Sequence, residues 1–199
     1  MCIRDRADGV KIPSYLSLYQ NELNAAGNVK TANLSMFCFW TGEKEIAKIP
    51  GVVGTEAGFM HGREVVKVDY DESEVSLSKL VEQASASSCA NEVYLEEDYD
   101  IAELRRQTEG KKVKQSGKFT ADSEVKYYLS KSSYRFVPMT PLQQAKVNSA
   151  IGERQQVEQY LSPRQQELYG LIKTGKLKTN KSCVNSDLNQ HWQMLIKKI

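Results

Sequence analysis

Residues 31–71 constrain the fold of this 199-residue chain more than any other stretch. The stretch begins with an apolar run that predicts a buried β-strand, and it continues with a charged segment whose apolar residues have helical spacing. It ends with two segments typical of strands, joined by a glycine-containing turn that favours a hairpin. These four segments are 34–40, 43–49, 52–59 and 64–70.

The surrounding sequence extends this pattern into a recognisable order of elements. A helix is expected at 12–26, before the first strand. After the hairpin, residues 76–85 repeat apolar side chains in helical register, and residues 91–96 alternate like a short strand. The order strand, helix, strand, strand, helix, strand predicts an α/β fold of the α+β type. We expect a ferredoxin-like split βαβ two-layer sandwich with both helices on one face of an antiparallel sheet.

The second half of the chain predicts helices and few strands. A short helix is expected at 101–107 and a basic surface loop at 110–117. Further helices are expected at 122–131, 140–151, 162–172 and 186–199. We therefore divide the chain into an N-terminal helix and linker (1–28), a core (29–135) and a helical C-terminal extension (136–199).

The composition is typical of a globular domain and does not indicate a protein that binds nucleic acid or a membrane. Hydrophobic residues make up 40% and charged residues 26%, which is ordinary for a globular domain. The net charge is +2 with both signs interspersed, so we expect neither a nucleic acid nor a membrane as partner.

Residues 1–6 resemble an assembly artefact more than a natural start. We therefore expect an incomplete N-terminus, and a cytoplasmic location is the default.

The four cysteines, Cys2, Cys38, Cys89 and Cys183, form no C-x-x-C pair, and their spacing fits neither a zinc site nor a dense disulfide framework. We expect no metal and no bound cofactor. Cys38 falls where the first strand gives way to a helix, and a helix N-terminus lowers the pKa of a thiol. Cys38 is therefore predicted to be reactive, and the alternative is an ordinary buried thiol.

The region around Cys38 resembles the A-type peptide methionine sulfoxide reductases. That family carries a G-C-F-W core, a K-x-x-G-V-x-x-T-x-x-G-Y segment, a G-H-x-E-x-V-x-V-x-Y-D strand and a later Y-L-x-K-N-P-Y segment. The matching residues here are Cys38-Phe39-Trp40 with Glu43, Pro50-Gly51-Val52-Val53 with Thr55, Glu64-Val65-Val66-Lys67-Val68 with Tyr70-Asp71, and Tyr128-Leu129 with Lys131 and Tyr134. Their order and spacing over roughly half the chain make the resemblance fairly specific. It identifies 29–135 as a methionine sulfoxide reductase-like core.

The resemblance implies a thiol-dependent oxidoreductase, a peptide-methionine (S)-S-oxide reductase that acts on methionine sulfoxide in proteins or small molecules. Cys38 would attack the sulfoxide sulfur. Glu64, kept protonated by apolar neighbours, would donate the proton that the departing oxygen needs. Phe39 and Trp40 would hold the methyl group of the substrate.

Attack would leave Cys38 as a sulfenic acid, which a second thiol must reduce. Cys89, at the end of a helix, and Cys183, on a tail expected to be flexible, are the candidate resolving residues. An external thiol such as thioredoxin or glutathione would complete the cycle, and direct reduction by that thiol is the third route.

The chain also differs from the family. Met36 and Phe37 stand where the family has glycines before the cysteine, and the tyrosines that bind the sulfoxide oxygen have no counterpart. Tyr94 and Tyr99 are the candidates to replace them. These differences indicate a divergent, compact member.

Two other functions fit the same residues. A catalytically silent relative that serves as a binding or scaffold module would have Cys38 buried and Glu64 directed to solvent. A peroxide-reactive thiol redox protein would have a cation, such as Arg63, beside the sulfur.

Overall fold

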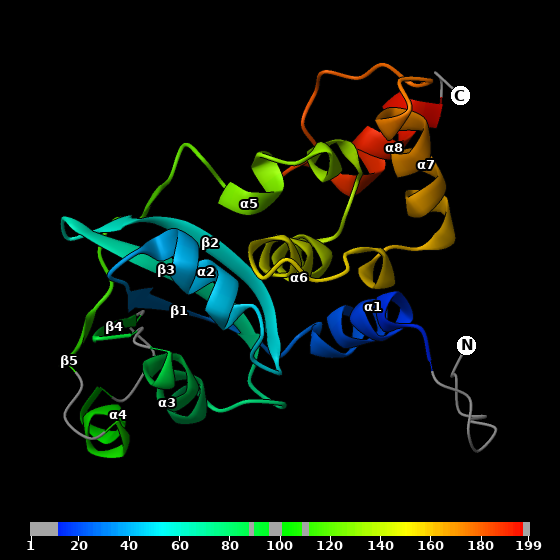
Figure 1. Ribbon diagram of the computed structural model, residues 1–199. Helices are drawn as coiled ribbons and strands as arrows, with labels where there is room; N and C mark the ends of the chain where they lie inside the picture. Colours follow the sequence, from blue (N-terminus) through cyan, green and yellow to red (C-terminus); the bar gives the residue numbers. More distant parts are fainter. Residues whose placement is uncertain (1–11, 88–89, 96–100, 109–111, 197–199) are drawn as a thin grey trace.

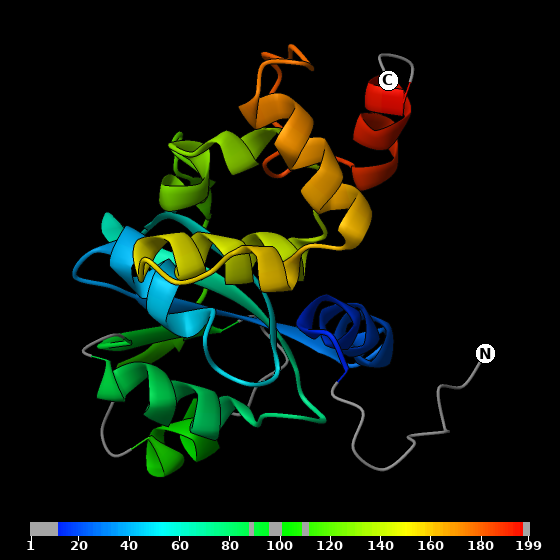
Figure 2. The same ribbon diagram turned by 45° about the vertical axis from the view of Figure 1, so that its right-hand side comes forward.

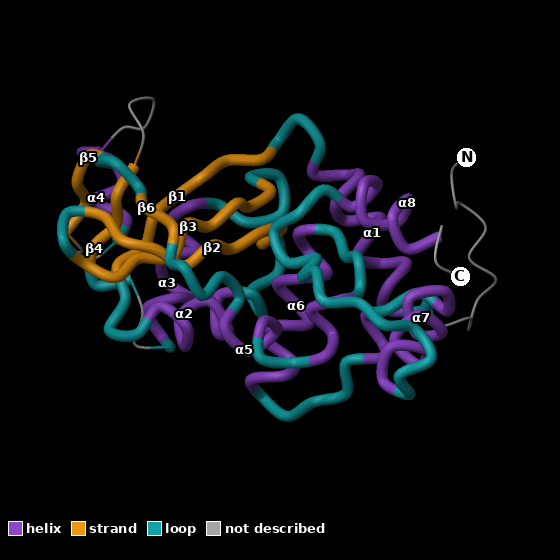
Figure 3. The backbone as a smooth tube through the Cα atoms, turned by 90° about the horizontal axis from the view of Figure 1, so that it is seen from above, coloured by secondary structure: helices purple, strands orange, loops and turns teal. Residues whose placement is uncertain are grey.

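The computed structural model describes residues 12–87, 90–95, 101–108 and 112–196. A β-sheet with helices on one face lies beside a C-terminal half made of helices (Figure 1; Figure 3, from above). The strands are β1 (Val29–Ser35), β2 (Val52–Met60), β3 (Arg63–Asp71), β4 (Glu92–Leu95), β5 (Lys112–Gln115) and β6 (Thr120–Ala121). The helices are α1 (Ser14–Ala25), α2 (Phe39–Ile46), α3 (Leu77–Ala86), α4 (Ile101–Gln107), α5 (Tyr127–Ser130), α6 (Pro141–Gly152), α7 (Pro163–Lys173) and α8 (Leu188–Ile196), with 3₁₀ turns η1 (Ser133–Phe136) and η2 (Glu158–Tyr160).

The sheet has six strands in the order β5-β4-β1-β3-β2-β6. Its four central strands pair antiparallel, with α2 between β1 and β2 and α3 between β3 and β4. This confirms the predicted α+β class, and the order β4-β1-β3-β2 is compatible with a ferredoxin-like sandwich. The basic loop predicted at 110–117 is wrong in part, because β5 pairs parallel to β4 there and adds an edge strand.

The hairpin between β2 and β3 confirms its sequence prediction. His61 and Gly62 form the turn, and both have positive φ, 50° and 73°. Two successive residues of positive φ define the type I′ turn, which matches the twist of the flanking strands. The turn fixes the register in which Phe59 faces Glu64.

The first strand ends earlier than its apolar run predicts. β1 stops at Ser35, and Phe39 and Trp40 belong to the first turn of α2. A short apolar run cannot distinguish a strand from a buried helix start, and Phe39 is apolar because it packs into the core. Helix α2 therefore starts before the predicted segment 43–49, and Cys38 is its N-cap residue.

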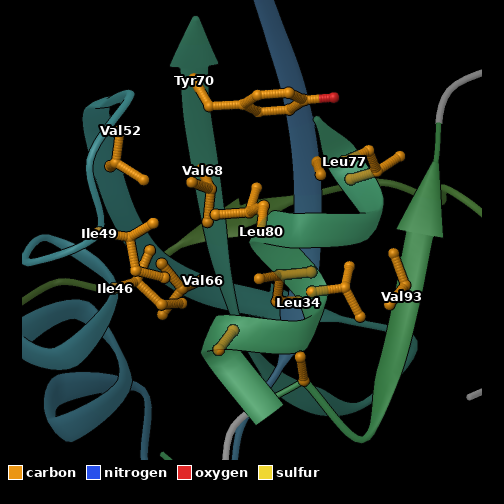
Figure 4. Packing of buried hydrophobic residues seen from close by; sticks show 14 of the residues in the cluster. Leu34, Ile46, Ile49, Val52, Val66, Val68, Tyr70, Leu77, Leu80 and Val93 are labelled. Atoms are coloured by element: carbon orange, nitrogen blue, oxygen red, sulfur yellow. The ribbon is translucent and has the colours of Figure 1, made fainter. Parts of the chain in front are cut away.

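One apolar core lies between the sheet and the helices α2 and α3 (Figure 4). Strands β1, β3 and β4 contribute every second residue to it, as a sheet with one face buried requires. Ile46 of α2 and Leu80 of α3 meet these strands from the same side, and both are fully buried. This core fixes α2, and with it Cys38, against the sheet.

A second apolar core fills the C-terminal half. Its buried members come from α5, α6, α7, α8 and the turns between them: Leu129, Val137, Met139, Val147, Ala150, Val157, Leu161, Leu168, Leu177 and Leu195. Helix α6 lies between this core and the sheet region, where it packs against α2 and β2 (Figure 2). The helices predicted at 140–151 and 162–172 are confirmed as α6 and α7.

Both α6 and α7 begin with a capping box. Thr140 and Ser162 accept hydrogen bonds from the backbone N–H groups of Gln143 and Gln165, whose side chains bond back to the capping residues. The two glutamine amides also bond each other, with each Nε2 3.0 Å from the other Oε1. Both side chains are buried, so the starts of the two helices are joined by a polar contact.

The far end of α2 is held by α6. Lys146 donates to the Ala47 carbonyl at 2.5 Å, and Ser149 donates to the Lys44 carbonyl at 2.8 Å. The last carbonyls of a helix have no partner within it, and these side chains supply one. The Lys44 ammonium also lies 2.5 Å from the Glu153 carboxylate at the end of α6.

None of the helices in the described ranges has the length and apolar character that crossing a bilayer requires.

Candidate active site

Cys38 occupies the N-cap position of α2 and is half-buried. Its backbone is extended, and its carbonyl accepts the N–H of Gly42 at 2.9 Å, the bond that starts the helix. The thiol therefore stands next to the N–H groups of the first helical turn, which have no partner inside the helix. This is the position that the sequence predicts for it.

The side chain of Glu64, a residue of β3, also lies at the start of α2. One carboxylate oxygen, Oε2, accepts the backbone N–H of Phe39 at 2.8 Å. The main-chain carbonyl of Glu64 accepts the N–H of Met36 at 2.8 Å. Glu64 is thus bonded to the chain on both sides of Cys38, and within the described ranges its other oxygen, Oε1, has no hydrogen-bond partner.

Aromatic rings line this position. Phe39 is buried and lies 5.2 Å from Phe59 and 5.6 Å from Trp40, measured between ring centroids. Phe59 is the cross-strand partner of Glu64 and is 43% exposed. Phe59 was not predicted to belong to the site, although the hairpin register places it beside Glu64.

Trp40 is fixed by a segment that lies far along the chain. Its indole Nε1 donates to Asp122 at 2.9 Å, and its ring stacks on Tyr127 at 4.1 Å and 16°. Neither residue was predicted to belong to the site. Only the pairing of β6 with β2, which brings this segment to the sheet edge, could have shown their role.

A buried ion pair anchors that segment. The Lys126 ammonium lies 2.6 Å from the Glu43 carboxylate, and both side chains are almost completely excluded from solvent. Lys126 also donates to the carbonyl of Thr55, and its backbone has φ 51°. A buried charge is tolerated only when it is paired and hydrogen-bonded. The pair therefore holds Asp122 and Tyr127 next to α2.

The two residues before Cys38, Met36 and Phe37, differ in their exposure to solvent. Met36 is buried, and a Cβ added at Gly42 would lie 2.5 Å from its sulfur, so its side chain fills the space over that glycine. Phe37 is 93% exposed. A phenyl ring in solvent therefore immediately precedes Cys38 in the chain.

Two other candidates both contact Glu92. Arg63 pairs with Glu92, with Nε 3.5 Å from the carboxylate. Tyr94 is fully buried and donates to Glu92 at 2.6 Å, and burial together with this bond raises the pKa of Tyr94 to about 12. Tyr94 is therefore not available to bind a substrate oxygen, and Tyr99 lies outside the described residues.

Cys183 does not lie on a flexible tail, which corrects the expectation from its Lys- and Asn-rich surroundings. Its side chain is 4% exposed, its N–H donates to the Arg135 carbonyl at 2.7 Å, and its thiol donates to the Phe136 carbonyl at 3.4 Å. Burial raises the pKa of Cys183 to about 11. The other candidate resolving residue, Cys89, lies outside the described residues, as does Cys2.

No group of three or more His, Cys, Asp or Glu side chains in the described ranges is arranged to hold a metal ion. The residues that the structure brings together are Cys38, Glu64, Phe39 and Trp40, which sequence analysis named. To these it adds Phe59, Asp122 and Tyr127.

Two comparisons relate this chain to known proteins. A scan against models of protein families gives no match. The chain is similar to the peptide methionine sulfoxide reductase MsrA of Methanococcus maripaludis, with 33% identity over 72 residues, 28% of this chain and 46% of the relative. It therefore spans about half the length of that curated relative. The similarity indicates a distant relationship to the MsrA proteins and favours an oxidoreductase.

Proposed function

We propose that the protein is a thiol-dependent oxidoreductase of the A-type peptide methionine sulfoxide reductase class, with Cys38 as nucleophile and Glu64 as proton donor. The observation that supports this most is the bond from the Phe39 N–H to the Glu64 carboxylate, at the residue after the cysteine. It brings an acid and a thiol to the same helix start from 26 positions apart in the sequence.

The proposed reaction uses both groups at once. The Cys38 sulfur attacks the sulfoxide sulfur and forms an S–S bond, while the sulfoxide oxygen takes a proton from Glu64. The hydroxyl group then passes to the Cys38 sulfur as the new S–S bond and the S–O bond of the substrate both break. The oxygen ends on Cys38 as a sulfenic acid, and the substrate leaves as a thioether, so sulfur is oxidised in the enzyme and reduced in the substrate. The bond to Phe39 occupies Oε2 and leaves Oε1 to carry the proton.

The aromatic rings suit the apolar part of this substrate. Trp40, which is partly exposed, and Phe59, which is 43% exposed, offer carbon surface for the methyl group beside the sulfoxide. Phe39, predicted to share this role, is buried in the core and supports the other two rings. The sulfenic acid then condenses with a thiol, water leaves, and a second thiol reduces the disulfide. We favour an external dithiol of the thioredoxin type for this step, because Cys183 is buried and its raised pKa leaves little thiolate.

A single-turnover assay tests the proposal. A peptide that contains methionine sulfoxide is mixed with reduced protein without dithiothreitol, and the sulfenic acid is trapped with dimedone and located by mass spectrometry. We expect one equivalent of thioether and a trapped adduct at Cys38. Cys38→Ser should give no product, and Cys183→Ser should react like the parent.

The second arm of the assay concerns Glu64. Glu64→Gln keeps the bond to Phe39 but cannot donate an acidic proton, so the rate should fall by roughly 100-fold or more. A normal rate would remove the acid from the mechanism. If the parent protein produces no thioether but Cys38 still forms a sulfenic acid with hydrogen peroxide, the peroxide-reactive alternative is the better one. If neither occurs, the silent binding module is.

A further inference from the structure

We propose that a cavity in the helical half, away from Cys38, binds the phosphate group of a small organic phosphate. The cavity has a volume of about 370 Å³ and is open to solvent. Its lining residues come from the segment that leads through α5 and η1 and from the loop before α8. Figure 1 shows the backbone of both segments in the helical half. Its lining residues are Ser123, Val125, Ser130, Arg135, Phe136, Asn180, Ser182 and Val184.

Arg135 supplies the charge. One guanidinium nitrogen donates to the Ser130 carbonyl at 2.9 Å, and the group lies 4.6 Å from the centre of the Phe136 ring. These contacts fix its direction but leave most of its five donors unused. Within the described ranges Arg135 pairs with no carboxylate, and no lining residue is acidic. Glu124, which is next to two lining residues, is paired with Lys131.

Uncharged donors surround this arginine. The side chains of Ser123 and Asn180 have no hydrogen-bond partner in the part of the chain that the structure describes. The Ser182 hydroxyl accepts the N–H of Val184, so its own proton can still be donated. An arginine fork with hydroxyl and amide donors beside it is the donor set that suits a phosphate oxyanion.

The loop that closes the cavity adds positive charge. Residues 173–182 contain four lysines and no acid. Cys183 ties this loop to the segment that carries Arg135, because its N–H donates to the Arg135 carbonyl at 2.7 Å. The positive loop would attract an anion toward the cavity mouth.

The size and the apolar part of the lining favour an organic phosphate over the free ion. A volume of about 370 Å³ is near the lower end for ligand pockets and exceeds what a single phosphate needs. Val125, Val184 and Phe136 provide a surface for a short carbon chain. This inference does not depend on the chemistry proposed for Cys38.

Calorimetric titration with glycerol 3-phosphate, inorganic phosphate and glycerol, in chloride buffer of low ionic strength, tests the proposal. We expect glycerol 3-phosphate to bind more tightly than inorganic phosphate, and glycerol not to bind. Arg135→Gln should weaken binding at least 10-fold. Lys178→Gln, which removes an exposed charge of the same loop outside the lining, should change it less than 2-fold.

Other outcomes would overturn the proposal. Failure of both phosphates to bind at millimolar concentration, or binding that Arg135→Gln leaves unchanged, would exclude the site. Equal affinity for the two phosphates would assign it to the free ion and exclude the organic ligand. If Arg135→Gln does not fold, Asn180→Ala and Ser182→Ala replace it, and each should weaken binding about 3-fold or more.

Discussion

The sheet region and the helical half are held together in different ways. The sheet region closes on an apolar core to which β1, β3, α2 and α3 contribute mainly aliphatic side chains. The helical half has an apolar core too, but its central helix α6 also buries Gln143, Gln144, Asn148 and Ser149. Each of these polar side chains bonds a partner on another element or on the chain that enters α6.

This difference bears on what each region can do. Apolar packing is non-directional and tolerates change of shape if volume is kept. Buried hydrogen bonds require particular partners at particular angles, and a missing partner is costly. The apolar core of the sheet region therefore supports the site without fixing its side chains, which are held by directional bonds such as that from Phe39 to Glu64 and that between Lys126 and Glu43. The helical half fixes positions, including those of the loop beside Cys183 and of the far end of α2.

The largest expected difference is in the rate at which a thiol reagent labels the two described cysteines, Cys38 and Cys183. At pH 8 the raised pKa of Cys183 leaves about one thiolate in a thousand, and burial hinders access as well. We expect iodoacetamide to label Cys38 at least about 100-fold faster, as followed by mass spectrometry. Faster labelling of Cys183 would show that the helical half opens readily.

The same thiol gives a pH dependence. The pKa of Cys183 rises from 9.0 to about 11 on folding, so the folded state keeps the proton longer than the unfolded state. The resulting contribution to stability is present below pH 9 and is lost as the pH rises through about 11. Urea unfolding of the parent and of Cys183→Ser at pH 8 and pH 11 should show a difference that shrinks at the higher pH.

The next effect concerns the apolar core of the sheet region. Leu34 is fully buried in β1, and Leu34→Ala should lower the free energy of unfolding by about 2–5 kcal/mol. Leu23→Ala, on an exposed face of α1, is the matched control and should change it by less than about 0.5 kcal/mol. Chemical denaturation measures both, and similar values would refute the assignment of Leu34 to the core.

A smaller loss is expected in the polar part of the helical half. Gln165→Ala removes the partner of the Gln143 amide and of the Pro138 carbonyl, and should cost about 1–3 kcal/mol. Gln159→Ala, on an exposed turn, serves as control. Because the two glutamines bond each other, the double variant with Gln143→Ala should lose less than the sum of the single ones. A sum that is simply additive would show that the pair is not coupled.

The smallest effect should come from the charged contact between the regions. Glu153→Gln breaks the pair with Lys44, whose hydrogen bond lowers the pKa of Glu153. The contribution is present above the usual carboxyl pKa and is lost as the pH falls. We expect a small decrease in Tm at low salt that disappears in ~0.5 M NaCl, because salt screens exposed charges. A decrease that persists in salt would mean that the contact stabilises by packing.

Sequence patterns predicted the sheet region well because its signals are local. The hairpin turn at His61-Gly62, the alternation of β3 and the helical spacing in α3 each depend on residues close together in the chain. The juxtaposition of Cys38 and Glu64 followed from the order of these elements together with the family resemblance.

Other parts depend on contacts that no local pattern encodes. Asp122 and Tyr127 reach Trp40 only through the pairing of β6 with β2. Cys183 is ordered because its N–H and its thiol donate to main-chain carbonyls about 50 residues earlier. One signal was present and unused: Thr140 and Ser162 each precede a glutamine by three residues, the pattern of a capping box.

Helix α2 is a rod of 8 residues, about 12 Å long, that is held at both ends by other elements. A helix this short does not persist in water by itself. The Glu64 carboxylate accepts its first N–H, that of Phe39, and Lys146 and Ser149 of α6 donate to its last carbonyls. The position of α6 therefore helps to fix the position of α2, which carries Cys38 at its other end. The helical half therefore stabilises the short helix at whose N-terminus Cys38 lies, although its own residues belong to a different core.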